Sequence, residues 1–170
     1  DIESVILADK LGFQEAFFGE HFTDLAEPIT SSLMFIARLA PVTTNIKLGS
    51  GVTNLPSYHP AMIAGHVAMM DNMLDGRFIW GIGPGGLPSD IEIFGNREID
   101  RNMKMVECFE QVMELWWGEA PYNLKGDFYT GSTEITFTPE IGQGIVPKPL
   151  HNPHPPIVVS ALAPLSLIHI

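Results

Sequence analysis

The sequence of 170 residues is poor in cysteine and in basic side chains. Its single cysteine, Cys108, excludes an internal disulfide framework and a cysteine-based metal site, and it favours a reducing compartment. Nine Lys and Arg stand against twenty Asp and Glu, for a formal net charge of −11. Nucleic acids and anionic membrane surfaces bind clustered basic side chains, so we expect neither as a partner.

Long apolar runs are also missing. No window of about 18 residues is free of charges and helix breakers, which excludes a membrane-spanning helix. Apolar residues still make up 45% of the chain and charged residues 17%, a composition typical of a protein with a folded core. We therefore predict a soluble, cytoplasmic protein of one domain, residues 1–170.

Predicted strands and helices alternate along most of the chain. Strands are expected at residues 15–19, 46–52, 77–83 and 155–162, and helices at residues 2–11, 31–39, 60–76 and 100–117. Gly12 and Gly76 stand where helices end in a left-handed residue, and Asp100 stands at an N-cap position. No helix is expected directly after the glycine-rich loop 81–86, and its glycines lack the spacing of a dinucleotide-binding loop.

This alternation predicts a parallel sheet covered by helices. Four strands fit either a small open sheet or about half of an eight-stranded barrel, and periodicity does not separate the two. Residues 118–150 break the rhythm with short β-like and proline-rich pieces, and we expect an insertion over the domain surface there.

Three stretches resemble the bacterial luciferase-like flavin-dependent monooxygenases. They are "GEHFTD" at residues 19–24, "IKLGSGVTNLPSYHPAMIAGHVAMMDNMLDGRFIWGIGPGG" at 46–86, and "IFG" at 93–95 followed by an arginine-led helix. The resemblance covers roughly residues 1–165 and is closest to monooxygenases that act on terpenes such as limonene. It implies an α/β fold: a partial (β/α)8 TIM barrel, truncated at the C-terminal side. Residues 165–170 are expected to be a non-native tail.

The resemblance also implies the chemistry. It implies reduced FMN, delivered by a separate flavin reductase, and transfer of one oxygen atom of O2 to a small apolar substrate. A non-prolyl cis peptide between Gly51 and Val52 is implied behind the flavin ring, and His21 is implied as the acid–base residue. The implied cofactor contacts are Gly51, Val52, Asn54, Gly86, Arg101 and Ser160. His21 is also expected to face the same cavity as Asn54 and the loop 83–86.

Several alternatives remain at this point. A deazaflavin-dependent oxidoreductase of the same superfamily fits the same motifs, and so does a flavin-binding relative without turnover. From the residues alone, His21 and Arg101 also fit ordinary surface positions. Pro84 stands where the luciferase α-type chain has an arginine that helps to hold the flavin phosphate, which weakens that detail of the comparison.

The remaining histidines and methionines have simpler interpretations. His59 precedes Pro60 and suits a helix start, and His66 suits a helix core or an interface. His151 and His154 have no partner carboxylate nearby in the sequence, so no metal site is predicted. The methionine stripe is expected in the core: Met62, Met69, Met70 and Met73. The resemblance implies that the helices at 31–39 and 60–76 also form the face of a homodimer.

Overall fold

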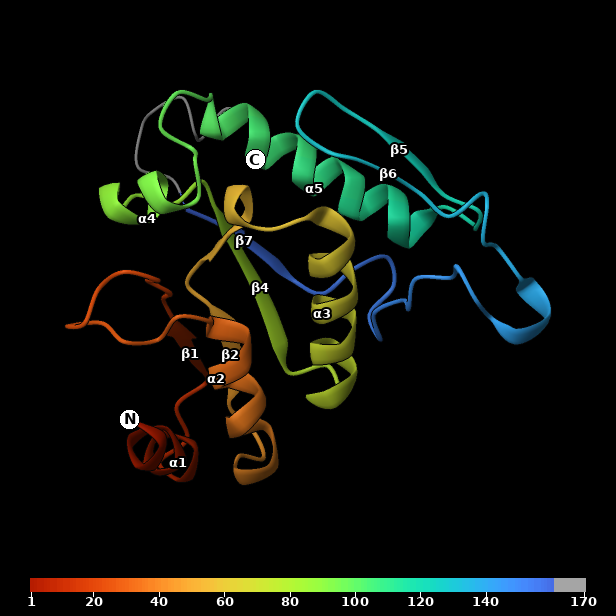
Figure 1. The fold of residues 1–170 in the computed structure, drawn as a ribbon. Coiled ribbons are helices and arrows are strands. Elements are labelled where there is room, and N and C mark those ends of the chain that lie inside the picture. The colour runs from red at the N-terminus through yellow and green to blue at the C-terminus, as the bar shows by residue number, and fades with distance from the viewer. Residues whose placement is uncertain (161–170) are drawn as a thin grey trace.

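The computed structural model describes residues 1–160, and their centre is a parallel sheet (Figure 1). The strands are β1 (Glu15–Phe18), β2 (Lys47–Ser50), β3 (Thr53–Asn54), β4 (Phe78–Gly83) and β7 (Ile157–Val159). β1 pairs with β2, β2 and β3 both pair with β4, and β7 pairs with β4. All of these pairs are parallel, as the alternation of strands and helices predicts.

β2 and β3 are two parts of the single strand predicted at 46–52. β2 pairs with the beginning of β4, where Leu48 lies opposite Phe78, and β3 pairs with its end, where Asn54 lies opposite Gly83. The Gly51–Val52 peptide between the two parts is cis, which confirms the predicted position.

Within residues 1–160, five α-helices accompany the sheet. They are α1 (Ile2–Lys10), α2 (Ser32–Leu39), α3 (Pro60–Met73), α4 (Pro88–Ile93) and α5 (Arg101–Trp117). The predicted signals at their ends are confirmed: the Asp100 carboxylate accepts from the first amides of α5, and Gly12 and Gly76 have φ angles of +84° and +77°.

Helix α4 contradicts the expectation that no helix follows the glycine-rich loop. It begins at Pro88, and proline is favoured at the first position of a helix because its fixed φ is already helical. The helix has only six residues, too few for a periodic apolar pattern to indicate it.

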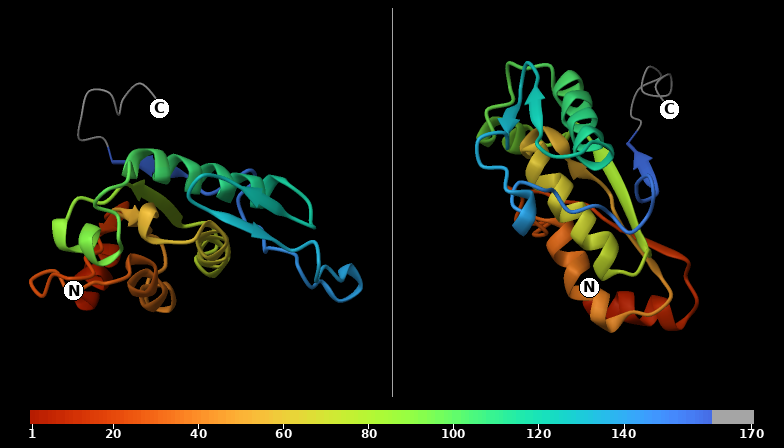
Figure 2. Two further views of the ribbon diagram at one scale, coloured as in Figure 1. Left: turned by 45° about the horizontal axis from the view of Figure 1, so that its top comes forward. Right: turned by 90° about the vertical axis from the view of Figure 1, so that its right-hand side faces the viewer.

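The core lies between the sheet and helices α2, α3 and α5, which lie beside the sheet in Figures 1 and 2. Trp80 of β4 is fully buried there, with its ring centroid 5.4 Å from that of Trp116 and 6.1 Å from that of Phe109. The other large buried side chains of the core include Ile36, Leu39, Ile63, Val67, Phe78 and Val112. Burial of this apolar area is the main favourable contribution to folding.

Residues 118–150 contain an antiparallel hairpin, β5 (Asn123–Lys125) with β6 (Thr130–Ser132), which extends beside α5 in Figure 2. The Glu107 carboxylate of α5 accepts from three consecutive amides of the hairpin turn, those of residues 127–129. Next to it, burial raises the pKa of the Cys108 thiol to about 12. The assignment of this segment as an insertion in one domain stays a prediction, and the expected tail at 165–170 lies outside the described residues.

The exposed side of α3 corrects the prediction for the methionine stripe. Met70 is buried, but Met62, Met69 and Met73 are 44%, 61% and 45% exposed, so the core assignment is wrong for these three. Ile63 and Val67 take the inward positions of the helix instead. His66 is exposed on α3 as well, so it is not a core residue.

His151 has a partner that the sequence does not indicate. Its Nδ1 lies 2.8 Å from a carboxylate oxygen of Asp71, a fully buried residue of α3, and its backbone amide donates to the other oxygen. The sequence does not indicate this partner carboxylate because the two residues are 80 positions apart. Among residues 1–160, no group of three or more His, Cys, Asp or Glu is placed to hold a metal ion, and no helix is long and apolar enough to cross a membrane.

Candidate functional site

Polar side chains gather where the parallel strands end, the edge at which parallel α/β folds place their ligands. Two adjoining hollows lie there, and Asn54, Ser57 and Asp90 line both of them. The first is completed by Glu20, Phe22, Thr30, Tyr58 and Phe94. The second is completed by Pro84, Gly85, Gly86, Ile91, Asn96 and Arg101. The loops after β1, β3 and β4 thus enclose one polar region.

The buried carboxylate of Glu20 organises the first hollow. One oxygen accepts from the backbone amide and the hydroxyl of Ser32 at 3.1 and 2.9 Å, and the other accepts from the backbone amide of Asn54 at 2.9 Å. The Asn54 side chain donates to the Glu20 carbonyl, so its orientation is fixed as well. Burial, and then the neighbouring Glu20, raise the pKa of Tyr58 above its ordinary value, which keeps this phenol neutral.

Asp90 of α4 holds the loop that follows His21. Its carboxylate accepts from the Phe22 amide at 3.1 Å, from the Thr23 amide at 2.8 Å and from the Thr23 hydroxyl at 2.6 Å. Burial alone would raise the pKa of Asp90, but the hydrogen bonds from Thr23 and Phe22 outweigh it, and the pKa lies below its usual value. Asp90 is therefore a fixed negative charge at the site.

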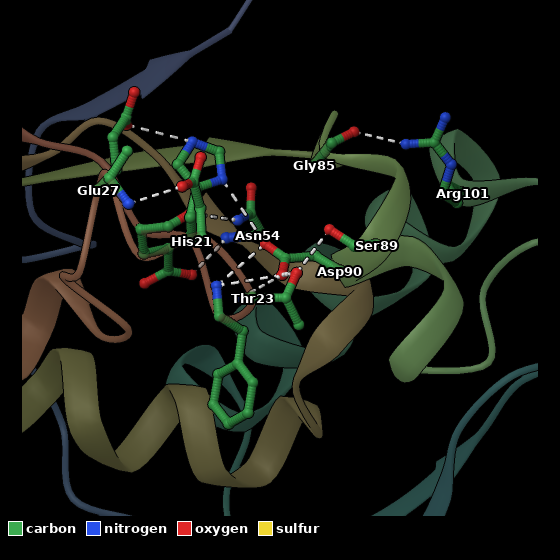
Figure 3. A network of polar contacts seen from close by, with 12 residues as sticks. His21, Thr23, Glu27, Asn54, Gly85, Ser89, Asp90 and Arg101 are labelled. Atoms are coloured by element: carbon green, nitrogen blue, oxygen red, sulfur yellow. Dashed lines mark hydrogen bonds and ion pairs between the residues drawn. The ribbon is translucent and has the colours of Figure 1, made fainter.

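His21 lies beside the hollows and is not part of their lining (Figure 3). Its Nδ1 is 3.6 Å from an Asp90 oxygen, and its Nε2 is 3.4 Å from an oxygen of Glu27, which is largely exposed. The expectation that His21 faces the same cavity as Asn54 and the loop 83–86 is therefore not met: the ring lies next to Asp90, which lines both hollows, but does not itself line them. Its predicted catalytic role stays a prediction.

The predicted cofactor residues fall into two adjacent groups. Asn54, Gly86 and Arg101 line the second hollow, where Arg101 donates to the carbonyls of Pro84 and Gly85 and so supports the loop. Val52 and Ser160 lie next to Gly83, and Gly51, joined to Val52 by the cis peptide, lies beside Phe17. The pairing of Asn54 with Gly83 joins the two groups.

Two observations concern the space around the predicted cofactor residues. A Cβ on Gly83 would lie 2.6 Å from both Val52 Cγ2 and Ser160 Oγ, so glycine alone lets these two side chains pack closely against β4. A Cβ on Gly86 would meet nothing within 4 Å, so the loop is open at this position. Val52, Ser160, Asn54 and Gly86 could hold a flat cofactor ring.

Sequence reasoning missed Ser57, Tyr58 and Asp90. Tyr58 and Asp90 interact with residues distant in the chain: Tyr58 lies beside Glu20, and the hydrogen bonds that Thr23 donates to Asp90 span 67 positions. The one local signal for Asp90 is its place two residues after Pro88, within the first turn of a short helix. His59, in contrast, is confirmed as a helix-start residue, because its ring accepts from the amide of Ala61.

Parallel strands packed against helices, with polar groups at the carboxyl ends of the strands, are the arrangement of an α/β type of enzyme site. The chain belongs to the luciferase-like monooxygenase family, whose model matches residues 2–168. The predicted resemblance and the predicted fold, part of a luciferase-like TIM barrel, are both confirmed.

Individual relatives agree with this assignment. The chain is 40% identical over 130 residues to limonene 1,2-monooxygenase from Rhodococcus erythropolis, a match that covers 76% of this chain and 33% of that protein. It is 29% identical over 167 residues to the oxygenase component of a flavin-dependent trigonelline monooxygenase from Acinetobacter baylyi, covering 97% of this chain and 43% of that protein. The chain thus spans a third to under half of these relatives.

Solved structures show the same fold. The oxygenating constituent of 3,6-diketocamphane monooxygenase from Pseudomonas putida, in complex with FMN, has a TM-score of 0.82 and 26% identity, covering 96% of this chain and 46% of that one. An F420-dependent secondary alcohol dehydrogenase has a TM-score of 0.75 at 22% identity, covering 94% of this chain and 47% of that one. The second likeness concerns the fold alone.

Proposed function

We propose that this chain forms the flavin-binding side of a monooxygenase that uses reduced FMN to transfer one oxygen atom of O2 to a small apolar substrate of the terpene or ketone type. The observation that carries the proposal is the 40% identity to a limonene monooxygenase, in a chain whose predicted flavin residues gather at one end of the sheet. The FMN-bound relative of the same fold supports FMN as the flavin.

Each part of the site has a task in this proposal. Val52 and Ser160 would lie against the ring, and Asn54 would offer its fixed amide to a polar edge of the ring. Reduced flavin, when bound, supplies the two electrons with which O2 is divided between product and water. His21 would hold a proton at its imidazole and exchange it with the reacting oxygen.

Exclusion of water is the other task of the protein, because water at the flavin favours side reactions. Phe22 and Phe94 stand at the rim of the first hollow in edge-to-face contact, with ring centroids 5.1 Å apart. This aromatic pair would give an apolar substrate a compatible surface beside the polar floor.

Two partners belong to the proposal. A separate reductase would deliver reduced FMN, as expected for a relative of a protein named an oxygenase component. A second copy of the chain would cover the exposed methionines of α3 at positions 62, 69 and 73, together with Met34 of α2, which is 76% exposed. Burying such a surface in a homodimer removes apolar area from water.

The test compares cofactors in a complete barrel that carries this chain. We expect FMN to bind, with quenching of the flavin fluorescence. Reduced FMN with limonene and ¹⁸O2 is expected to give a product that carries one labelled oxygen atom. Binding of deazaflavin F420 without FMN would instead favour the hydride-transferring alternative. Binding of neither cofactor would favour a relative without turnover.

A further inference from the structure

One carboxylate oxygen of Asp90 accepts more hydrogen bonds than the other. Its Oδ1 accepts from the Thr23 amide and hydroxyl, while the Phe22 amide is 3.1 Å from both oxygens. The side chain is 11% exposed. Such a carboxylate cannot rotate without breaking several hydrogen bonds, so the direction of Oδ2 is set by the chain that directly follows His21.

The ring of His21 needs a partner in that direction. Its Nδ1 is buried and has no partner at hydrogen-bonding distance, although a buried ring nitrogen normally has one. The nearest acceptor is Asp90 Oδ2 at 3.6 Å, and a movement of under about 1 Å would bring it to the usual 2.7–3.2 Å.

Other acidic groups near the ring are less suited to this role. Glu27 lies 3.4 Å from Nε2, but its side chain is 68% exposed and has no fixed position comparable to that of Asp90. Glu20 directly precedes His21, but its oxygens already accept from Ser32 and Asn54.

Helix α4 contacts three consecutive residues of this loop. Asp90 lies beside His21, and the hydroxyl of Ser89 is 2.6 Å from that of Thr23 (Figure 3). The ring of Phe94, which directly follows the helix, packs on that of Phe22. The helix therefore holds the chain that directly follows His21 and places a carboxylate beside its ring.

We propose that Asp90 is the positioning residue of His21: Oδ2 accepts a hydrogen bond from Nδ1–H and thereby fixes the tautomer in which Nε2 exchanges the proton. A carboxylate oxygen can only accept, so the nitrogen that faces it carries the hydrogen, and the lone pair is left on the other nitrogen. The proton-exchange part rests on the proposed function, whereas the tautomer does not.

The decisive variant is Asp90→Asn in the complete protein, read by the ring ¹⁵N shifts of His21 in two-bond ¹H–¹⁵N spectra, with a His21→Gln variant to assign the signals. We expect the Nδ1–H form in the parent protein. The amide of the new side chain can donate to Nδ1, so the variant is expected to move to the Nε2–H form.

Three controls separate positioning from folding. Ser89→Ala removes a contact of the same loop without touching His21, and Glu27→Gln removes the exposed carboxylate. Thr23→Val removes the hydroxyl that donates to Asp90 Oδ1 but keeps the backbone amide that donates to the same oxygen, and it does not alter Oδ2. All three are expected to keep the parent tautomer, even where Thr23→Val lowers the Tm as much as Asp90→Asn does.

Turnover gives the second measurement. Asp90→Asn is expected to bind FMN within about 3-fold of the parent and to lose about 10-fold or more of its product per reduced flavin. An unchanged tautomer in Asp90→Asn, or a changed one in Glu27→Gln or Thr23→Val, would overturn the proposal. If the protein proved to use another cofactor, the tautomer would still decide the role of Asp90, so the two proposals fail separately.

Discussion

Gly83→Ala tests the surface on which we propose that the flavin ring lies. The added methyl carbon would stand 2.6 Å from Val52 Cγ2 and from Ser160 Oγ. Carbon atoms pack best at about 3.5–4.0 Å, so the overlap with Val52 is about 1 Å. Ser160 can turn its hydroxyl away, but Val52 is β-branched and has one favoured rotamer, so it must be displaced.

The magnitude follows from this overlap. Overpacking of this kind costs about 1–3 kcal/mol of the free energy of unfolding. Displacement of Val52 and Ser160 toward the ring should also weaken FMN binding by about 10-fold, or about 1.4 kcal/mol. Urea unfolding measures the first effect, and titration of FMN by fluorescence quenching measures the second, both in the complete protein.

Gly86→Ala is the matched control for stability, because its Cβ would meet no atom within 4 Å. It is expected to change stability by under about 0.5 kcal/mol. The reasoning is refuted if Gly83→Ala binds FMN as tightly as the parent while losing stability, because Val52 and Ser160 would then not contact the flavin.

Three more predictions concern other parts of the chain. His21→Ala should bind FMN within a few-fold, yet product should fall by about 10²-fold with hydrogen peroxide released instead; unchanged product per reduced flavin, measured together with peroxide, would contradict this. Amides of residues 44–46, led by Thr44, lower the pKa of Asp9 to about 2 against the opposing effect of burial. The charge of Asp9 therefore contributes about 1–2 kcal/mol to the free energy of unfolding above pH 4, and this contribution is lost as the pH falls toward 2. Urea unfolding should separate Asp9→Asn from the parent at pH 7 and no longer at pH 2. Met69→Lys should shift the sedimentation of a homodimer toward the monomer, whereas a monomeric parent protein would rule out the proposed dimer face.

The sequence predicts most elements of this fold because their signals are local. Asp100 caps its own helix, Pro60 begins another, and the apolar runs at 46–52 and 77–83 specify buried strands. Local signals fail where length or distant contacts decide. Helix α4 is too short for a periodic pattern, and three methionines of α3 match the composition of a core although the helix turns them outward.

The candidate site is likewise predicted only in the part that depends on local signals. Glycines and polar residues at strand ends indicate the correct edge of the sheet, because parallel strands end on one side. The partners of His21 do not follow from the sequence, since Asp90 reaches it from a helix that follows a different strand. Which residues of a site hold one another is a property of the packing, and periodicity carries no information about it.

The pair of Asp71 and His151 bears on the order in which the chain folds. The two residues are 80 positions apart, and the nearby Lys148 ammonium donates to the last carbonyls of α5. Closing a loop of this length costs entropy before any contact is gained, so local helices form first. We therefore expect β7 to join β4 as a late step, after α3 and α5 offer Asp71 and the helix end as its anchors, and amides of β7 should gain protection from hydrogen exchange later than those of β4.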